Sequence, residues 1–414
     1  MTGHHPTWQR TVLGSITLAL IAMVAVAALS GCSTTNGANT GPINIGISLS
    51  LSGDFSADGQ AFQQGYQLWA HDINAKGGLL GRQVKLDIVS DASSPTQVAT
   101  NYQKLITVDK DQLVFGPFSS LLTKPASVVA HRYGYAFPEG AGGGPSVFTQ
   151  GLNNLFDVSL PVANNLNSFA NYILSLPASQ RPTTAAYATE DDPFTQPQID
   201  TARKLLEAGG VKTVYYKVYP SETTDYTPIA TGIIQSGAQI VIAGTLLPDI
   251  SAFMQDFKTQ HYNPQALIAT AGPDQGTQFL NAVGGTADAE AVFVPNGWYP
   301  QLNTFQNSQM VSEYLAKYGG DASAISSDVA EAYAVGQVVA QAVTKDGNLD
   351  NTELISTLHS GTFNSVQGPV KFDSTGQNTA AAAFLFQWQS GQLIPVFPAD
   401  QAKAAPEFPK PNWP

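Results

Sequence analysis

Hydrophobic positions change their spacing along the chain, and the change predicts strands that alternate with helices. Residues 43–51 alternate apolar with small or polar side chains, which is typical of a half-buried strand. After this strand, large apolar side chains recur every three or four positions, at Phe62, Tyr66, Trp69 and Ile73. That interval lines one face of a helix, so the first unit is a strand followed by an amphipathic helix.

The same alternation recurs through the rest of the chain. Short apolar runs typical of strands lie at 84–88, 113–115, 183–189, 214–219 and 240–243. Helical patterns follow several of them, for example through 126–130 and 199–206. Repeated strand–helix units predict an α/β fold built from parallel sheets with helices on both faces. Ligands of such folds bind in the crevice at the carboxyl ends of the strands.

The N-terminal region predicts a processing signal rather than part of the fold. Arg10 is the only charged residue before an uncharged, apolar stretch at 11–29. A basic start followed by an apolar run describes a secretory signal. The run ends in LSGC, which resembles a bacterial lipobox, and its Cys32 is the only cysteine of the chain. We expect a lipoprotein signal peptide over 1–31, acylation of Cys32, and a flexible tether over 32–41.

This N-terminus predicts a bacterial protein held outside the cytoplasm by a lipid anchor in the cell membrane. A plain transmembrane anchor is the alternative, because about 20 apolar residues can span a bilayer.

Length and charge limit the classes that remain. The residues after the tether exceed what one hydrophobic core usually supports, so two lobes are expected. The chain has 19 basic and 31 acidic residues, and loss of Arg10 with the signal would leave 18 basic ones. The sequence contains no run of Lys and Arg, and its acidity argues against nucleic-acid binding.

Motifs of catalysis and metal binding are missing from the sequence. The six histidines are widely spaced and form no HExxH pattern. There is no G-x-S-x-G elbow, no phosphate-binding loop and no CxxC. The adjacent acids Asp191 and Asp192 are expected in a solvated loop. The sequence therefore predicts no catalytic residues, no metal site and no cofactor.

Six short runs, in their order and spacing, carry a resemblance to a known family. They are IGISLSLSG at 45–53, DINAKGGLLGR at 72–82, SDASSP at 90–95, FGPFSS at 115–120, TEDDPF at 189–194 and GPVKFD at 368–373. Together they resemble the leucine/isoleucine/valine-binding protein family, the branched-chain amino-acid type of periplasmic solute receptor, over residues 43–397. The resemblance implies two lobes that close around a small molecule, with ABC permease and ATPase subunits as partners and no enzymatic activity.

The same resemblance implies a periplasmic binding protein type I fold, in which a three-stranded hinge joins two discontinuous lobes. The first lobe is expected over 42–161 and 297–367, and the second over 162–296 and 368–398. Residues 399–414 show no packing pattern and are expected to form an extended tail. A monomer is expected. The alternative with the same fold is a ligand sensor coupled to a signalling receptor.

The first group of candidate ligand contacts lies after predicted strands of the first lobe. Ser119 and Ser120 stand at a strand–helix junction, where hydroxyls cap the helix and free backbone N–H groups suit a carboxylate or carbonyl. By resemblance, Ser120 takes the place of the serine that holds the amino-acid carboxylate; a cap without a ligand is the alternative. Gly142 and Gly143 belong to a glycine run at 140–144 that admits close approach of the backbone to a ligand. A flexible turn is the alternative there, and the threonine usual in the family is missing near Gly143.

The second lobe departs further from the family. By resemblance, Phe194 replaces a tyrosine, Leu246 replaces another, and Gly272 stands where the acid that neutralises an α-ammonium group is expected. Burying an ammonium without a partner acid costs several kcal/mol. Either Asp274, Asp58 or Glu139 therefore supplies the charge, or the ligand is not an α-amino acid.

These departures predict a pocket that is less polar than the family's amino-acid site. An apolar or aromatic carboxylate or a neutral amide then joins the amino acids as a candidate ligand. Trp298 could stack on such a ligand; packing near the hinge is the alternative.

Overall fold

The computed structural model describes residues 41–414 together with Met1, and residues 42–414 form one compact unit. The expected signal peptide, its Cys32 and most of the expected tether lie outside the described residues. Over the part of the chain that the model describes, none of the helices combines the length and apolarity needed to cross a membrane.

The first sheet region is built from five short parallel strands. Its strands are β1 (Ile43–Leu49), β2 (Val84–Ser90), β3 (Leu113–Phe115), β4 (Phe137–Glu139) and β5 (Leu155–Asp157). Strands β2, β1 and β3 pair in parallel in that order, with Ile45 of β1 opposite both Leu86 and Leu113. β4 and β5 form a second parallel pair, which a hydrogen bond from Gly116 N to Pro138 O (2.8 Å) links to the end of β3. β3 is buried throughout and consists of apolar residues only, whereas β2, at the edge of its sheet, is largely half-exposed and alternates apolar with polar residues.

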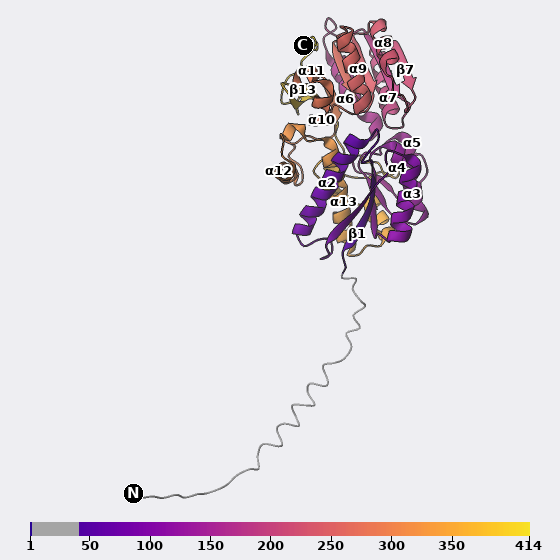
Figure 1. Ribbon diagram of the computed structural model, residues 1–414, viewed down its shortest axis with the longest axis vertical. Coiled ribbons are helices and arrows are strands. Elements are labelled where there is room, and N and C mark those ends of the chain that lie inside the picture. The colour runs from indigo at the N-terminus through magenta and orange to yellow at the C-terminus, as the bar shows by residue number, and fades with distance from the viewer. Residues whose placement is uncertain (2–40) are drawn as a thin grey trace. The chain divides into compact units, whose positions relative to one another are not determined.

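Helices from distant parts of the sequence cover this first region (Figure 1). They are α2 (Ser56–Ala75), α3 (Pro95–Lys104), α4 (Ser120–Arg132), α5 (Pro145–Phe148), α12 (Asn307–Tyr318), α13 (Ser327–Asp346) and α14 (Asn351–Ser360). Two helix-interior glycines let α2 and α13 approach closely. A Cβ on Gly65 would lie 2.3 Å from Val329 O, and one on Gly336 would lie 2.1 Å from the ring of Trp69. Glycine destabilises the interior of a helix, and the close packing of α2 against α13 explains why it occurs at these two positions.

A seven-stranded sheet forms the second region, in the order β14-β13-β10-β9-β8-β6-β7. Its strands are β6 (Thr184–Glu190), β7 (Lys212–Tyr219), β8 (Ile240–Gly244), β9 (Ala266–Ala269), β10 (Phe293–Asn296), β13 (Phe384–Gln389) and β14 (Gln392–Phe397). Strands β6 to β10 are parallel as expected, but β13 and β14 run antiparallel to their neighbours. A two-residue turn joins β13 to β14 as a hairpin, and its Ser390 and Gly391 both have positive φ, as tight hairpins require.

Alternate residues of this sheet enter two separate cores. Ala186 and Ala188 of β6 belong to one core, whereas Ala185 and Tyr187 belong to the other, as the two-residue period of a strand dictates. The helices α6 (Asn167–Ser175) and α7 (Thr195–Ala208) cover one face; α8 (Thr227–Ser236), α9 (Leu247–Thr259) and α10 (Thr277–Val283) cover the other. The expected α/β class with helices on both sheet faces is confirmed.

Three connections run between the two regions, called here the first and second lobes: after β5, after β10, and between β12 (Gly368–Val370) and β13. β12 pairs with β11 (Phe363–Ser365), and Val370 and Phe372 pack in the core of the first lobe. Residues 368–372 therefore pack with the first lobe, which differs from the assignment of 368–398 to the second. The hydrophobic pattern of such a short hairpin does not show which lobe the hairpin packs against, so the sequence could not decide the assignment.

The C-terminal tail forms no helix or strand and packs against the second lobe, although its sequence shows no packing pattern. Lys410 is only 5% exposed. Its backbone N–H donates to Gln265 O (2.7 Å), its Nζ donates to Asn263 Oδ1 (2.8 Å), and Nζ lies 3.5 Å from the ring centre of Trp413. Such single contacts of an irregular segment leave no periodic signal in a sequence.

Candidate functional site

A cavity lies between the two lobes and holds about 580 Å³ of empty space. Its walls in the first lobe come from loops after β1, β3, β4 and β5, and in the second lobe from loops after β6, β9 and β10. The first turns of α13 complete the wall. The carboxyl ends of parallel strands thus meet at this point, where ligands of open α/β sheets bind.

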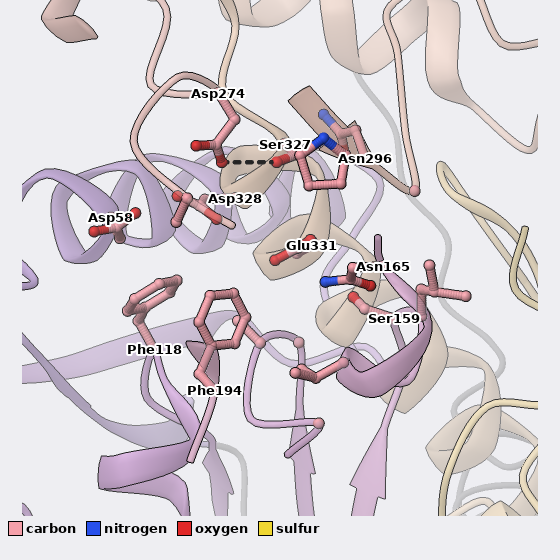
Figure 2. Close-up of a pocket in the computed structure, with 18 of the residues that line it drawn as sticks. Asp58, Phe118, Ser159, Asn165, Phe194, Asp274, Asn296, Ser327, Asp328 and Glu331 are labelled. Carbon is pink, nitrogen blue, oxygen red and sulfur yellow. Dashed lines mark hydrogen bonds between the residues drawn. The ribbon is translucent and has the colours of Figure 1, made fainter. Parts of the chain in front are cut away.

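Carboxyl groups dominate the polar part of this wall. Five acids line the cavity, and no Lys, Arg or His is among its described lining residues; the acids are Asp58, Asp157, Asp274, Asp328 and Glu331. In the view of Figure 2, Glu331 lies between the upper group of Asp58, Asp274 and Asp328 and the residues near β5. The described lining contains no tyrosine, but acids from both lobes line the cavity, so the pocket is more polar than the departures from the family predicted.

One amide ties two of these acids together. The Nε2 of Gln275 donates to Asp58 Oδ1 (2.5 Å) and to Asp328 Oδ2 (2.6 Å). Ser327 Oγ donates to Asp274 Oδ2 over 3.4 Å. The other oxygens of Asp58 and Asp274 are buried without any hydrogen-bond partner. Each of these carboxyls consequently keeps one unused acceptor.

A second pair of acids lies at the ends of β4 and β5. Asp157 Oδ1 accepts from the backbone N–H of Ser159 (2.9 Å), and Glu139 Oε2 accepts from that of Gly142. Asp157 Oδ2 and Glu139 Oε1 are buried and unpartnered. A Cβ on Gly143 would lie 2.3 Å from Asp157 Oδ2, so a glycine is needed there to leave space for this carboxyl.

Burial raises the pKa of every one of these acids, and neighbouring carboxyls raise several of them further. The pKa of Asp274 rises to about 6 and that of Asp157 to about 7, each because of burial. Burial and then the charge of Asp274 raise the pKa of Asp328 to about 8. The pKa values of Asp58, Glu139 and Glu331 also rise well above their usual range, first through burial and then through adjacent acids. Several of these groups therefore hold protons at neutral pH.

Two phenyl rings line the cavity near the acids, below them in the view of Figure 2. Phe118 follows β3 in the first lobe and Phe194 precedes α7 in the second, and their ring centres are 6.2 Å apart. Phe118 is held by edge-to-face contacts with Phe55 and Phe62. The two rings form the apolar contact between the lobes at this cavity.

Asp192 was expected in a solvated loop, but it is buried and positions Phe194. Asp192 is 3% exposed, and its Oδ1 accepts from the backbone N–H groups of Phe194 (2.6 Å) and Thr195 (3.1 Å). It thereby satisfies donors at the start of α7, whereas its neighbour Asp191 is exposed.

The two serines predicted to meet a ligand lie behind the cavity wall rather than in it. Ser120 is fully buried, and its Oγ accepts from Gly144 N (2.9 Å). Ser119 has φ of 76°, and its buried Oγ has no partner. Gly142 and Glu139 likewise sit behind the wall, which Gly143 lines.

The second-lobe candidates are also divided between wall and interior. Phe194 and Asp274 line the cavity together with Asp58, but Leu246, Gly272 and Trp298 do not. Leu246 is buried at the start of α9, and Gly272 makes a turn with φ of 97° that leads to Asp274. Trp298 is packed, and its Nε1 donates to Asn307 Oδ1 (2.7 Å).

Three acids of the wall were missed from the sequence: Asp157, Asp328 and Glu331. Asp328 and Glu331 lie three residues apart in α13, whose residues from Val329 to Val343 are otherwise mostly apolar and buried. Charges inside such a pattern are the signal that could have found them, because isolated buried acids are rare.

The comparisons agree with this architecture. A family model described as a periplasmic binding protein matches residues 42–392. Leu/Ile/Val-binding protein homolog 7 of Brucella melitensis is 24% identical over 391 residues, which cover 92% of this chain and 96% of the relative.

Two solved structures share the fold. The branched-chain amino acid transporter substrate binding protein LivJ of Streptococcus pneumoniae, in complex with isoleucine, aligns with a TM-score of 0.74 and 19% identity, over 89% of this chain and all of that one. A solute binding protein of an ABC transporter from R. palustris, in complex with benzoate, aligns with a TM-score of 0.75 and 17% identity, over 89% and 99%.

Proposed function

The chain belongs to the periplasmic binding protein family, and on this premise we propose that it captures a small organic solute between its lobes and delivers it to an ABC importer. The expected type I fold of this family is confirmed. Its members bind solutes outside the cytoplasm and are not enzymes, which confirms the expectation that the chain is not an enzyme.

The cavity between the lobes is the observation that carries the proposal. It is lined from both lobes at the ends of their parallel strands, so a solute bound there touches both halves. A ligand that contacts both lobes stabilises the closed arrangement over an open one, and a permease can recognise that difference in shape. Micromolar capture corresponds to about −8 kcal/mol, which a few buried hydrogen bonds and the apolar rings can supply.

The relatives place this chain among receptors for amino acids and similar small molecules. The names of these relatives refer to leucine, isoleucine and valine, and the two complexes hold isoleucine and benzoate. Because these ligands differ in charge and shape, the ligand of this chain follows from its own cavity side chains rather than from the family.

A lipid on Cys32 would keep the receptor beside its permease. The LSGC tetrapeptide after an apolar run supports cleavage before Cys32 and acylation of its thiol. Mass spectrometry of the protein from its host should find a chain that begins at Cys32 and carries acyl groups. Cys32→Ala should leave the signal uncleaved and the thiol-linked lipid missing; an unmodified N-terminus in the native protein would refute the anchor.

Native mass spectrometry of the full chain tests the receptor function. We expect one small molecule per chain, displaced by Ala271→Trp, because Ala271 lines the cavity. Ala208→Trp is the matched control, since Ala208 is exposed near the end of α7. Loss of uptake of the same solute in cells without the chain would establish import. Normal uptake there, or turnover of the solute by the pure chain, would refute the proposal.

A further inference from the structure

The cavity is an acidic enclosure whose described lining contains no basic side chain. This inference rests on the proposed function, which makes the cavity the ligand site. We infer that the ligand is a small organic cation with two amino groups joined by a short hydrocarbon chain. Each part of that description follows from a separate feature of the cavity.

Positive charge follows from the lining. Five carboxyl groups face a space that no described Lys, Arg or His lines. Ionised carboxylates that are buried together need positive charge nearby, or they hold protons instead. A ligand carboxylate would add to the repulsion and would find no cation to pair with. The wall therefore favours a cation and disfavours an anion such as benzoate.

Amino groups follow from the unused acceptors. Asp58 Oδ2, Asp157 Oδ2 and Asp274 Oδ1 are each at least nine-tenths buried and have no hydrogen-bond partner. Buried polar atoms are normally paired, and leaving one unpaired costs free energy. An ammonium group brings three donors and a charge. A bare metal ion fits less well, because the described residues contain no group of three or more side chains placed to hold one.

Two amino groups follow from the arrangement of the acids. Asp58, Asp274 and Asp328 form one group around Gln275, on the side of α2 and α13. Asp157, at the end of β5, lines another part of the cavity, with Glu139 of β4 behind it. Glu331 lies in the electrostatic range of both groups. Unpartnered oxygens occur in each group, so one ammonium at each end satisfies both.

The hydrocarbon spacer follows from the rings. Phe118 and Phe194 line the same cavity, and their faces suit methylene groups and attract a neighbouring cation. A flexible alkyl chain between two ammonium groups can therefore contact the rings of Phe118 and Phe194, while the ammonium groups contact the carboxyl groups.

Calorimetry and thermal shift of the full chain in detergent provide the test. The probes are the α,ω-diamines with three to six carbons, n-butylamine, 1,4-butanediol, leucine, and Ca²⁺ or Mg²⁺ alone. We expect one diamine to bind at least about 10-fold more tightly than butylamine, because each charge-assisted hydrogen bond adds about that factor. Butanediol, leucine and the metal ions should not raise the melting temperature.

Variants locate the effect in the cavity. Asp274→Asn and Asp157→Asn, one from each group, should each weaken diamine binding roughly 10- to 100-fold. Asp400→Asn, in the exposed C-terminal segment, is the control and should bind normally. The melting temperature of each ligand-free variant reports whether it is folded, so loss of affinity is separable from loss of structure.

Each other outcome has a defined meaning. Equal affinity for butylamine overturns the second amino group, and stabilisation by a metal ion alone overturns the organic cation. If leucine or butanediol binds and the diamines do not, the cation is wrong while the receptor function stands. If no probe binds and native mass spectrometry finds no co-purified molecule, the receptor function fails as well.

Discussion

The buried carboxyl groups of Asp91 and Asp274 differ in whether side chains and backbone of the protein donate hydrogen bonds to both carboxyl oxygens. Asp91 follows β2 and is fully buried. Its carboxyl accepts from Ser48 Oγ (2.9 Å), Ser50 Oγ (2.7 Å) and Ser93 N (3.0 Å). Asp274, in the cavity, has one long contact from Ser327 and an oxygen with no partner.

The difference separates a structural carboxyl from a binding one. Burial raises the pKa of both acids, and hydrogen bonds counteract the rise at each; at Asp91 the hydroxyls of Ser50 and Ser48 contribute most, whereas at Asp274 backbone N–H groups contribute more than Ser327. A protein that satisfies a buried acid from its own chain uses it to fix a loop; one that leaves acceptors open in a cavity leaves them for a ligand. The predictions below test this contrast.

The largest expected effect is the loss of the satisfied site. Asp91→Ala should lower the free energy of unfolding by about 3 kcal/mol, because it leaves buried hydroxyls of Ser48 and Ser50 without their acceptor. Urea denaturation of the full chain, beside Asp274→Ala, measures the difference. Equal destabilisation by the two variants would remove the contrast.

The stability of the ligand-free protein should fall as pH rises. Asp157 and Asp328 have folded pKa values of about 7 and about 8, above the value near 4 of an unfolded aspartate. The folded state therefore holds more protons than the unfolded one between about pH 4 and 8. Between pH 6 and 8 the free energy of unfolding should drop by on the order of 1 kcal/mol per pH unit. Denaturation curves at several pH values would contradict this by showing a maximum at pH 8.

A smaller effect is expected from Glu331, the acid between the two groups of acids. Glu331→Gln removes a carboxyl group in the electrostatic range of both groups of acids, one that an incoming dication would ionise, and should weaken diamine binding about 10-fold. Glu222→Gln is the matched control, because Glu222 is exposed. Calorimetry measures both; similar affinities in the two variants would remove Glu331 from the site.

The smallest effect is a gain of stability. Asp328→Asn removes a buried acid beside Asp274 and should raise the free energy of unfolding by about 1 kcal/mol at pH 8. Near pH 5 the gain should vanish, because the wild-type carboxyl is already protonated there. A gain of equal size at both pH values would point to packing instead of charge.

Local patterns predicted most of the fold but only part of the site. Strand alternation located β1, β6 and β8 closely, because burial imposes the same period on sequence and structure. It could not show that β13 and β14 are antiparallel, which a turn decides, or that an irregular tail packs through Lys410.

Residues adjacent to predicted strand ends were within reach of the sequence. Gly143, Phe194 and Asp274 lie in such loops, Asp58 lies in the first turn of α2, and all four line the cavity. Asp328 and Glu331 enter it from α13, hundreds of positions away from Asp58 along the chain, so only tertiary structure brings them together. Without them the pocket looked less polar than it is.

Proton release on ligand binding tests the central claim most directly. The cavity acids hold protons near neutral pH, and an incoming dication stabilises their ionised forms. Calorimetry of diamine binding at pH 7, in buffers of different ionisation enthalpy, should show protons released and an affinity that rises between pH 6 and 8. Binding without proton release, or an affinity that falls over that range, would contradict a cavity built to hold a cation.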